Sequence, residues 1–134
     1  MIKFNVEGIF YLNNAQNIAV IGASNNQSKF GYKITQALKE RFNVYPINPK
    51  ENKILDLNCY KSILDIPENI KIDIASIVVP PNISYSVLDG LAQRGVDLVW
   101  FQPGSYDSKV INKANDLKIN FLVNQCILTE SQKL

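Results

Sequence analysis

The chain has 134 residues, of which 46% are hydrophobic and 19% are charged, and this is the size and composition of one soluble globular domain. Its formal net charge of +2 is too small, and its like charges too dispersed, to indicate binding to nucleic acid or to an anionic membrane. The first residues lack the apolar run of a secretory signal, and no stretch approaches the roughly 20 apolar residues that span a bilayer. We therefore expect a cytoplasmic protein.

The absence of histidine excludes several kinds of chemistry within this chain. Neither a Ser-His-Asp or Cys-His nucleophile system nor a histidine-ligated zinc site can form. The two cysteines, Cys59 and Cys126, are far apart in the sequence and cannot make a thiolate metal site alone. We expect no metal site and no catalytic residues, so any catalysis would have to use carboxylates, a lysine, a thiol or a partner protein.

The first half of the chain predicts two helices, two strands and a turn. Residues 1–16 predict a short amphipathic helix, and the apolar run 18–21 predicts a buried strand that ends at Gly22. Apolar residues at helical spacing predict a helix within 29–41. A weaker strand follows at 44–47, and because Pro46 lacks an N–H group, this strand suits the edge of a sheet. A short turn at 62–66 ends before Pro67.

The second half repeats the alternation. A strand at 74–79 stops at two prolines, a helix at 83–94 ends at Gly95, and a strand at 98–101 follows. A helix within 105–117 has Ser105 or Asp107 as its cap, and a last strand lies at 119–123. The pattern predicts one α/β, Rossmann-like three-layer domain over residues 1–134, with an about five-stranded parallel sheet and helices on both faces. A mixed α+β fold is the alternative.

In such sheets ligands bind outside the carboxyl ends of the strands, so the residues that follow each strand are the candidate site. Residues 22–31 form a polar loop between two glycines, where free backbone N–H groups would face an anion and Lys29 adds positive charge. The loop lacks the GxGxxG spacing of a dinucleotide fingerprint. A surface turn with two incidental glycines would give the same pattern.

Three further loops should reach this edge. Asn48-Pro49-Lys50 follows the second strand where NAD-binding units place an acidic residue, and its cation suits a phosphorylated ribose; a simple Asn-Pro turn is the alternative. Val79-Pro80-Pro81 would give a stiff apolar shelf, which could lie against an adenine or a pantetheine arm or have a purely structural role, and Asn82 can cap the next helix. Trp100 is expected in the core. Beyond it come Gln102, Gly104 and Cys126, the last either a small buried hydrophobe or a reactive thiol.

Together these motifs resemble the CoA-binding domain family. The matching segments are IAVIGAS (18–24), KFGYKI (29–34), VYPINPK (44–50), VVPP (78–81) and WFQPG (100–104), in the family's order and across residues 17–129. The chain is similar to stand-alone CoA-binding proteins and to the N-terminal domains of ADP-forming acyl-CoA synthetases and of the succinyl-CoA synthetase α-subunit. The large synthetases use further domains and a phosphorylated histidine, so the resemblance does not imply their activity.

The resemblance implies a role for each matching position. Gly22, Ala23 and Ser24 would meet the pyrophosphate of CoA, with Lys29, Phe30 and Gly31 completing that loop. Asn48, Pro49 and Lys50 would lie beside the adenosine and its 3′-phosphate. Val79, Pro80 and Pro81 would flank the nucleotide or the pantetheine, and Gln102, Gly104 and Cys126 would lie toward the far side of the cleft.

Three hypotheses follow. The first is a non-catalytic module that binds coenzyme A or an acyl-CoA, as a sensor, a carrier or a subunit of a larger assembly. The second is an NAD(P)-binding regulatory or oxidoreductase-type protein, and the third is an enzyme that uses Cys126 or a carboxylate on a CoA thioester. The expected partner is a small nucleotide cofactor, with neither nucleic acid nor membrane, and a homodimer or a partner protein is possible. Gly31 could either face the cofactor or pack its helix on the sheet.

Overall fold

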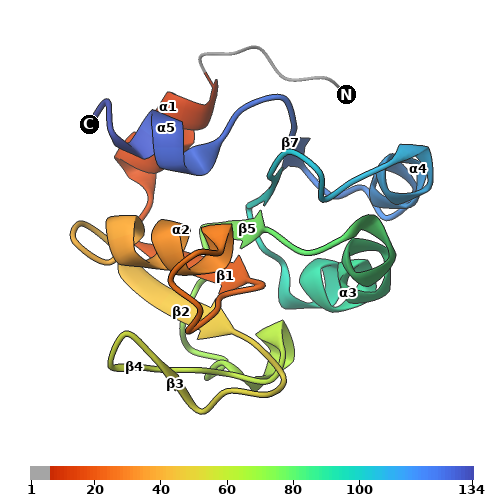
Figure 1. Ribbon diagram of the computed structural model, residues 1–134. Coiled ribbons are helices and arrows are strands. Elements are labelled where there is room, and N and C mark those ends of the chain that lie inside the picture. Colours follow the sequence, from red (N-terminus) through yellow and green to blue (C-terminus); the bar gives the residue numbers. More distant parts are fainter. Residues whose placement is uncertain (1–6) are drawn as a thin grey trace.

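The computed structural model describes residues 7–134, and its centre is a parallel sheet (Figure 1). The sheet has five strands in the order β2-β1-β5-β6-β7. In register, Ala19 lies opposite Tyr45 on one side and Ala75 on the other, and every pairing in the sheet is parallel. The strands are β1 (Asn17–Ile21), β2 (Asn43–Ile47), β5 (Ile74–Ile77), β6 (Leu98–Phe101) and β7 (Phe121–Leu122). The predicted fold class is confirmed.

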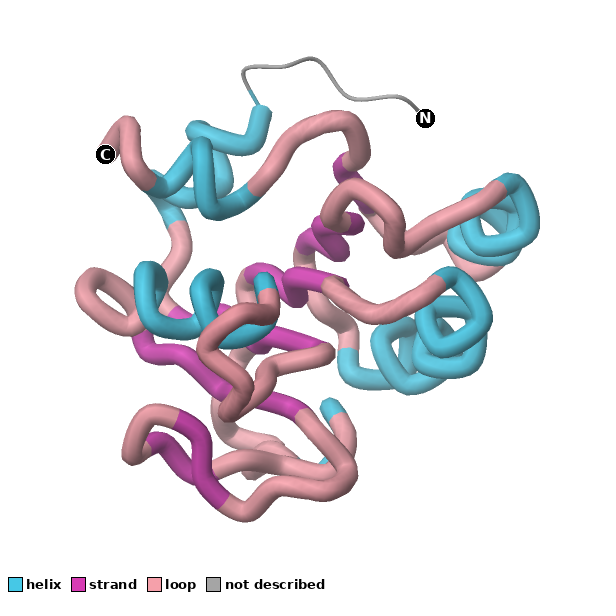
Figure 2. Tube along the Cα trace, in the orientation of Figure 1, coloured by secondary structure: helices cyan, strands magenta, loops and turns pink. Residues whose placement is uncertain are grey.

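Helices cover both faces of the sheet, which gives three layers (Figures 1 and 2). On one face lie α1 (Glu7–Asn14), α2 (Phe30–Leu38) and α5 (Ile127–Ser131). On the other lie α3 (Pro81–Arg94), α4 (Ser108–Asp116) and the short 3₁₀ helix η1 (Ile63–Asp65). Within the described residues, no helix is both long enough and apolar enough to cross a membrane.

Alternate residues of each central strand enter different cores. In β1, Ile18 and Val20 pack in the core under α1, α2 and α5, whereas Ala19 and Ile21 pack in the core under α3 and α4. Because both faces are covered, the strands are continuous apolar runs rather than alternating ones. Trp100 of β6 is fully buried, as predicted, and its Nε1 donates a hydrogen bond to the carbonyl oxygen of Gln125 at 2.8 Å.

The predicted start of α4 and the predicted end of α3 are confirmed. Asp107 caps α4 by accepting a hydrogen bond from the N–H of Val110 at 3.0 Å, and α3 ends at Gly95 with a left-handed φ of 73°. The expectation that Asn82 caps α3 is wrong. Pro80 holds the cap position and Pro81 opens the helix, because the fixed φ of proline suits the first helical turn and its missing N–H costs nothing there.

Several short elements differ from the prediction or were not predicted. The third strand, expected to reach residue 79, ends at Ile77, and β7 has only two residues. A small antiparallel hairpin, β3 (Lys53–Ile54) with β4 (Leu57–Asn58), and the helix α5 had no clear sequence signal. A helix was expected over residues 1–16. Residues 1–6 lie outside the described residues, and within the rest the structure has a helix at Glu7–Asn14. Pro46 lies in β2, at the edge of the sheet as expected.

Candidate functional site

Two adjoining hollows lie at the carboxyl ends of β1, β2 and β5, each with a volume of about 520 Å³. Gly22, Asn48 and Val79 line both of them; Gly22 and Asn48 directly follow β1 and β2, and Val79 lies two residues beyond the end of β5. The first hollow, here called the loop hollow, is lined by Gly22, Ala23, Ser24, Ser28, Lys29, Phe30, Gly31, Asn48, Val78, Val79 and Pro80. Nine of the fifteen predicted site residues are therefore brought together in it.

Two glycines give the loop hollow its shape. Gly22 has a φ of 98°, and a Cβ there would lie 2.8 Å from Cγ1 of Val79 and 2.9 Å from the carbonyl oxygen of Val78. A Cβ on Gly31 would overlap the carbonyl oxygen of Gly22 itself. Glycine at both positions lets the start of α2 approach the end of β1 at backbone distance.

The start of α2 offers hydrogen-bond donors to this hollow. Lys29 holds the cap position without a side-chain cap, and no hydrogen bond in the described part of the chain uses the N–H of Phe30 or of Gly31. Unpaired N–H groups at a helix start, with the positive end of the helix dipole, favour an anion. The exposed ammonium of Lys29 adds a full positive charge beside them. The arrangement suits a phosphate or pyrophosphate group.

Side chains close this loop and fix it to its surroundings. Oγ of Ser24 accepts a hydrogen bond from the N–H of Asn26 at 3.0 Å. Nδ2 of Asn25 donates to the carboxylate of Glu51 and, at 3.0 Å, to the carbonyl oxygen of Lys53. The loop that follows β1 is thereby held against the segment that leads into the hairpin.

Asn48 links the two loops that follow β1 and β2. Its Nδ2 donates to the carbonyl oxygen of Ala23 at 2.9 Å, and its Oδ1 accepts from the N–H of Lys50 at 2.8 Å. The side-chain amide of Asn48, predicted to lie beside a ribose, therefore forms hydrogen bonds with the backbone of the site. Pro49 lines the second hollow, whereas exposed Lys50 lines neither.

The second hollow, here called the apolar hollow, lies between the end of β2, the helix η1 and α3. Its lining is mostly apolar and includes a few polar side chains: Ile21, Gly22, Ile47, Asn48, Pro49, Lys61, Ser62, Ile63, Leu64, Val79, Ile83, Ser86, Val87 and Gly90. The sequence predicted a turn at 62–66 but gave no sign that it lies against the site. An apolar slot with a few polar groups suits a planar base and its sugar.

Arg94, at the end of α3, holds the wall of the apolar hollow in place. One guanidinium nitrogen donates to the carbonyl oxygens of Ile63 and Ile66 at 3.0 and 2.6 Å. The other donates to those of Pro67 and Ile70 at 2.7 and 2.8 Å. The planar guanidinium therefore ties the loop that contains η1 to α3 through four backbone contacts.

Five predicted site residues line neither hollow: Lys50, Pro81, Gln102, Gly104 and Cys126. Gln102 is only 3% exposed; its Nε2 donates to Oγ of Ser76 at 3.2 Å, and its Oε1 accepts from the N–H of Ile127 at 2.9 Å. Gln102 thus joins β5 and α5 inside the protein. Cys126 immediately precedes α5 and is partly buried.

One titratable group with a shifted pKa lies directly behind the site. Sγ of Cys59 is 3.7 Å from the carbonyl oxygen of Asn48, and burial raises the pKa of this thiol, with smaller opposing contributions from the Asn48 hydrogen bond and from Lys61. A raised pKa keeps the thiol protonated at neutral pH, which is the unreactive form. The thiol of Cys59 therefore contacts the backbone of Asn48 in its unreactive form.

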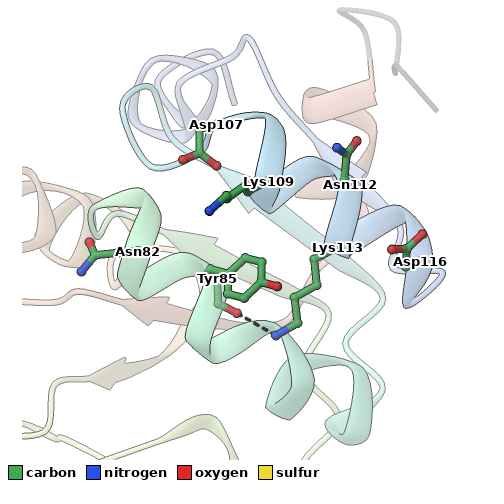
Figure 3. Close-up of a pocket in the computed structure, with 7 residues that line it drawn as sticks. All are labelled: Asn82, Tyr85, Asp107, Lys109, Asn112, Lys113 and Asp116. Atoms are coloured by element: carbon green, nitrogen blue, oxygen red, sulfur yellow. Dashed lines mark hydrogen bonds between the residues drawn. The ribbon is translucent and has the colours of Figure 1, made fainter.

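A third surface groove, of about 630 Å³, lies between α3 and α4 (Figure 3). Figure 3 shows Lys113 reaching across it to the carbonyl oxygen of Tyr85, at 3.1 Å, and the same ammonium pairs with Asp89 at 3.0 Å. The groove contains two lysines and two aspartates, so opposite charges balance within it. It has neither the glycine loop nor the free helix start found at the loop hollow.

A parallel sheet with a glycine loop between β1 and α2 defines the chain as a Rossmann-like domain of the nucleotide-binding class. The model of one family, described as a CoA binding domain, matches residues 16–132. The chain belongs to this CoA-binding domain family, as the motifs predicted.

Curated relatives agree with this assignment. An ADP-forming acetate–CoA ligase from Methanocaldococcus jannaschii is 43% identical over 88 residues, which are 64% of this chain and 12% of the relative. A second such ligase, from Archaeoglobus fulgidus, is 41% identical over 95 residues, 69% of this chain and 13% of the relative. The chain thus corresponds to about an eighth of the length of these ligases.

Solved structures show the same fold at two sizes. A hypothetical protein from Pyrococcus horikoshii matches with a TM-score of 0.88 and 29% identity, over 98% of this chain and 92% of its own. A conserved hypothetical protein from Pyrococcus furiosus matches with a TM-score of 0.80 and 31% identity, over 87% of this chain and 99% of its own. A larger match is the acetyl-coenzyme A synthetase 1 of Candidatus Korarchaeum cryptofilum, solved with phosphate and ADP. Its TM-score is 0.73 at 29% identity, and the match covers 86% of this chain but only 27% of the synthetase.

Proposed function

We propose that the chain binds coenzyme A or an acyl-CoA across the two hollows, as a module without a catalytic centre of its own. The observation that carries the proposal is that the loop hollow and the apolar hollow adjoin and share Gly22, Asn48 and Val79 in their linings. The chain in which they adjoin is a member of the CoA-binding domain family. A ligand that combines a pyrophosphate with an adenosine needs these two environments side by side.

In this proposal the pyrophosphate lies in the loop hollow. The free N–H groups of Phe30 and Gly31 donate to its oxygens, and Lys29 neutralises part of its charge. A side chain at Gly22 or Gly31 would fill the space or displace the backbone that forms it. The residues that line the loop hollow therefore suit the pyrophosphate of coenzyme A, the ligand that the family's description implies.

The adenosine lies in the apolar hollow, with Pro49 and Val79 as part of its walls. We propose that the pantetheine arm passes Pro80, which lines the loop hollow. The roles predicted for Pro81, Gln102, Gly104 and Cys126 stay predictions, since these residues line neither hollow.

The proposal stops at binding. The sequence contains no histidine, and the chain corresponds to about an eighth of the length of the ligases it resembles. We propose a role as a sensor, a carrier or a subunit of a larger assembly, in a reducing, cytoplasmic location that suits two free thiols.

Thermal melts with CoA, NAD and NADP side by side test this function. A ligand at 100 times its dissociation constant stabilises the folded protein by about 2.7 kcal/mol, which a melt resolves easily. We expect CoA to raise the melting temperature and NAD to leave it unchanged. Lys29→Met should reduce the CoA effect, whereas Lys39→Met, which removes an exposed charge just beyond the other end of α2, should not. A shift with NAD or NADP alone, or with none of the three, would overturn the proposal.

A further inference from the structure

We propose that Lys61 binds the phosphate monoester on the ribose of the ligand, and so makes the site selective for a nucleotide with a third phosphate. The inference rests on the proposed function and assigns a residue that the motifs did not single out. Among the residues that the structure describes, 7–134, two charged side chains line the hollows, and they are Lys29 and Lys61. In the described part of the chain, the lining of each hollow contains one lysine and no carboxylate.

The two lysines belong to different parts of the cleft. Lys29 stands at the start of α2 in the loop hollow, and Lys61 stands beside Ser62 in the apolar hollow. A ligand that fits this pattern has two separate anionic groups, with an apolar or aromatic part near the second. A pyrophosphate linked to a phosphorylated nucleoside has this charge distribution, whereas the adenosine end of NAD lacks the second anion.

The backbone next to Lys61 is held firmly against the site. The N–H of Tyr60 donates to the carbonyl oxygen of Pro46 at 2.9 Å, and the carbonyl oxygen of Tyr60 accepts from the N–H of Asn48 at 3.0 Å. These bonds extend the pairing of β2 by a parallel bridge between Ile47 and Tyr60. Lys61 is thereby positioned by the same segment that forms the floor of both hollows.

The ammonium of Lys61 keeps its charge available for an anion. Its Nζ donates to the carbonyl oxygen of Glu51 at 3.2 Å and to Oδ1 of Asn52 at 3.3 Å, and both acceptors are neutral. No carboxylate in the described part of the chain forms an ion pair with it. The nearby carboxylate of Glu51 instead accepts a hydrogen bond from Asn25. A lysine held by neutral acceptors is a suitable partner for a phosphate.

Lys50, which the sequence placed beside the same phosphate, has a different position. Its N–H bonds to Oδ1 of Asn48, but its exposed side chain lines neither hollow. The geometry therefore assigns phosphate selectivity to Lys61 rather than to Lys50.

Calorimetric titration of four proteins with CoA and dephospho-CoA tests the assignment. The proteins are the wild type, Lys61→Met, Lys50→Met and Lys109→Met, the last as a matched loss of charge in the groove between α3 and α4. We expect the wild type to bind CoA roughly tenfold more tightly than dephospho-CoA, the size of one hydrogen bond to a charged group. In Lys61→Met this ratio should fall close to one through weaker CoA binding alone, and in the other two variants it should persist.

The outcomes separate this inference from the proposed function. If the wild type binds both ligands equally, or if Lys61→Met keeps the wild-type ratio, the Lys61 assignment is wrong while CoA binding stands. If the wild type binds neither ligand, both proposals fail. Unchanged melting temperatures for Lys61→Met, and a restored ratio in Lys61→Arg, would show that the effect comes from the charge rather than from the fold.

Discussion

At the scale of single residues, the sequence left two roles open for Gly31, and its position in the structure is compatible with both. A Cβ on Gly31 would overlap the backbone of Gly22, so the glycine is needed for helix packing before any ligand arrives. Its N–H is also one of the two free donors at the start of α2. Stability and binding are therefore coupled at this position.

Gly31→Val should consequently lower the melting temperature and CoA affinity together. Forcing a side chain into a closely packed position costs about 1–3 kcal/mol, and the displaced loop loses its donor geometry. Chemical denaturation and CoA titration measure the two effects. Gln36→Ala, on the exposed side of the same helix, is the control and should stay within about 0.5 kcal/mol of the wild type. A Gly31→Val protein with wild-type stability and no CoA binding would show instead that Gly31 serves the ligand alone.

Other residue roles were beyond the sequence because their partners lie far along the chain. Gln102 looks like a polar residue at a strand end, but its contacts with Ser76 and Ile127 bury it inside the protein. Lys61 looks like an ordinary surface lysine until the pairing of Tyr60 with β2 places it in the apolar hollow. A local sequence motif shows which polar side chains a loop contains, but tertiary contacts determine which of these side chains can reach a ligand.

At the scale of elements, prediction succeeded where a periodic pattern is long or a strand is buried on both faces. The strands β1 and β6 and the helix α3 have such patterns. The hairpin of β3 and β4 contains only two residues per strand, and its turn places Leu55 and Asp56 at positive φ without a glycine to mark it. Elements of this length depend on tertiary contacts, so no periodicity could reveal them.

The position of η1 depends on one such tertiary contact, the four carbonyl oxygens held by Arg94. Arg94→Met should loosen the wall of the apolar hollow and weaken CoA binding about tenfold, or about 1.4 kcal/mol. Binding of 4′-phosphopantetheine, which has no adenosine, should change little. Titration with both ligands measures the difference, with Gln93→Met, an exposed neighbour on α3, as the control. Equal losses for the two ligands would mean that Arg94 supports the fold generally rather than the apolar hollow.

At the scale of the whole molecule, parallel strand order brings the loops after β1, β2 and β5 to one edge, where they build a single cleft. The sequence predicted this edge and most of the loop hollow, because Rossmann-like topology fixes where strand ends meet. It did not predict the apolar hollow, whose walls come from η1 and from the inner side of α3. The two hollows together, and not the larger groove between α3 and α4, combine a glycine loop beside a lysine with an apolar lining, which is the pattern on which the proposed CoA binding rests.

The most direct test of this account is a titration of ¹⁵N-labelled protein with CoA, followed by the backbone amide signals. We expect the largest chemical-shift changes at the amides of Gly22, Phe30 and Gly31 and of residues 61–64, and no change at the amides around Tyr85 and Lys113 in the other groove. Shifts concentrated around Tyr85 and Lys113, with the glycine loop unaffected, would contradict it.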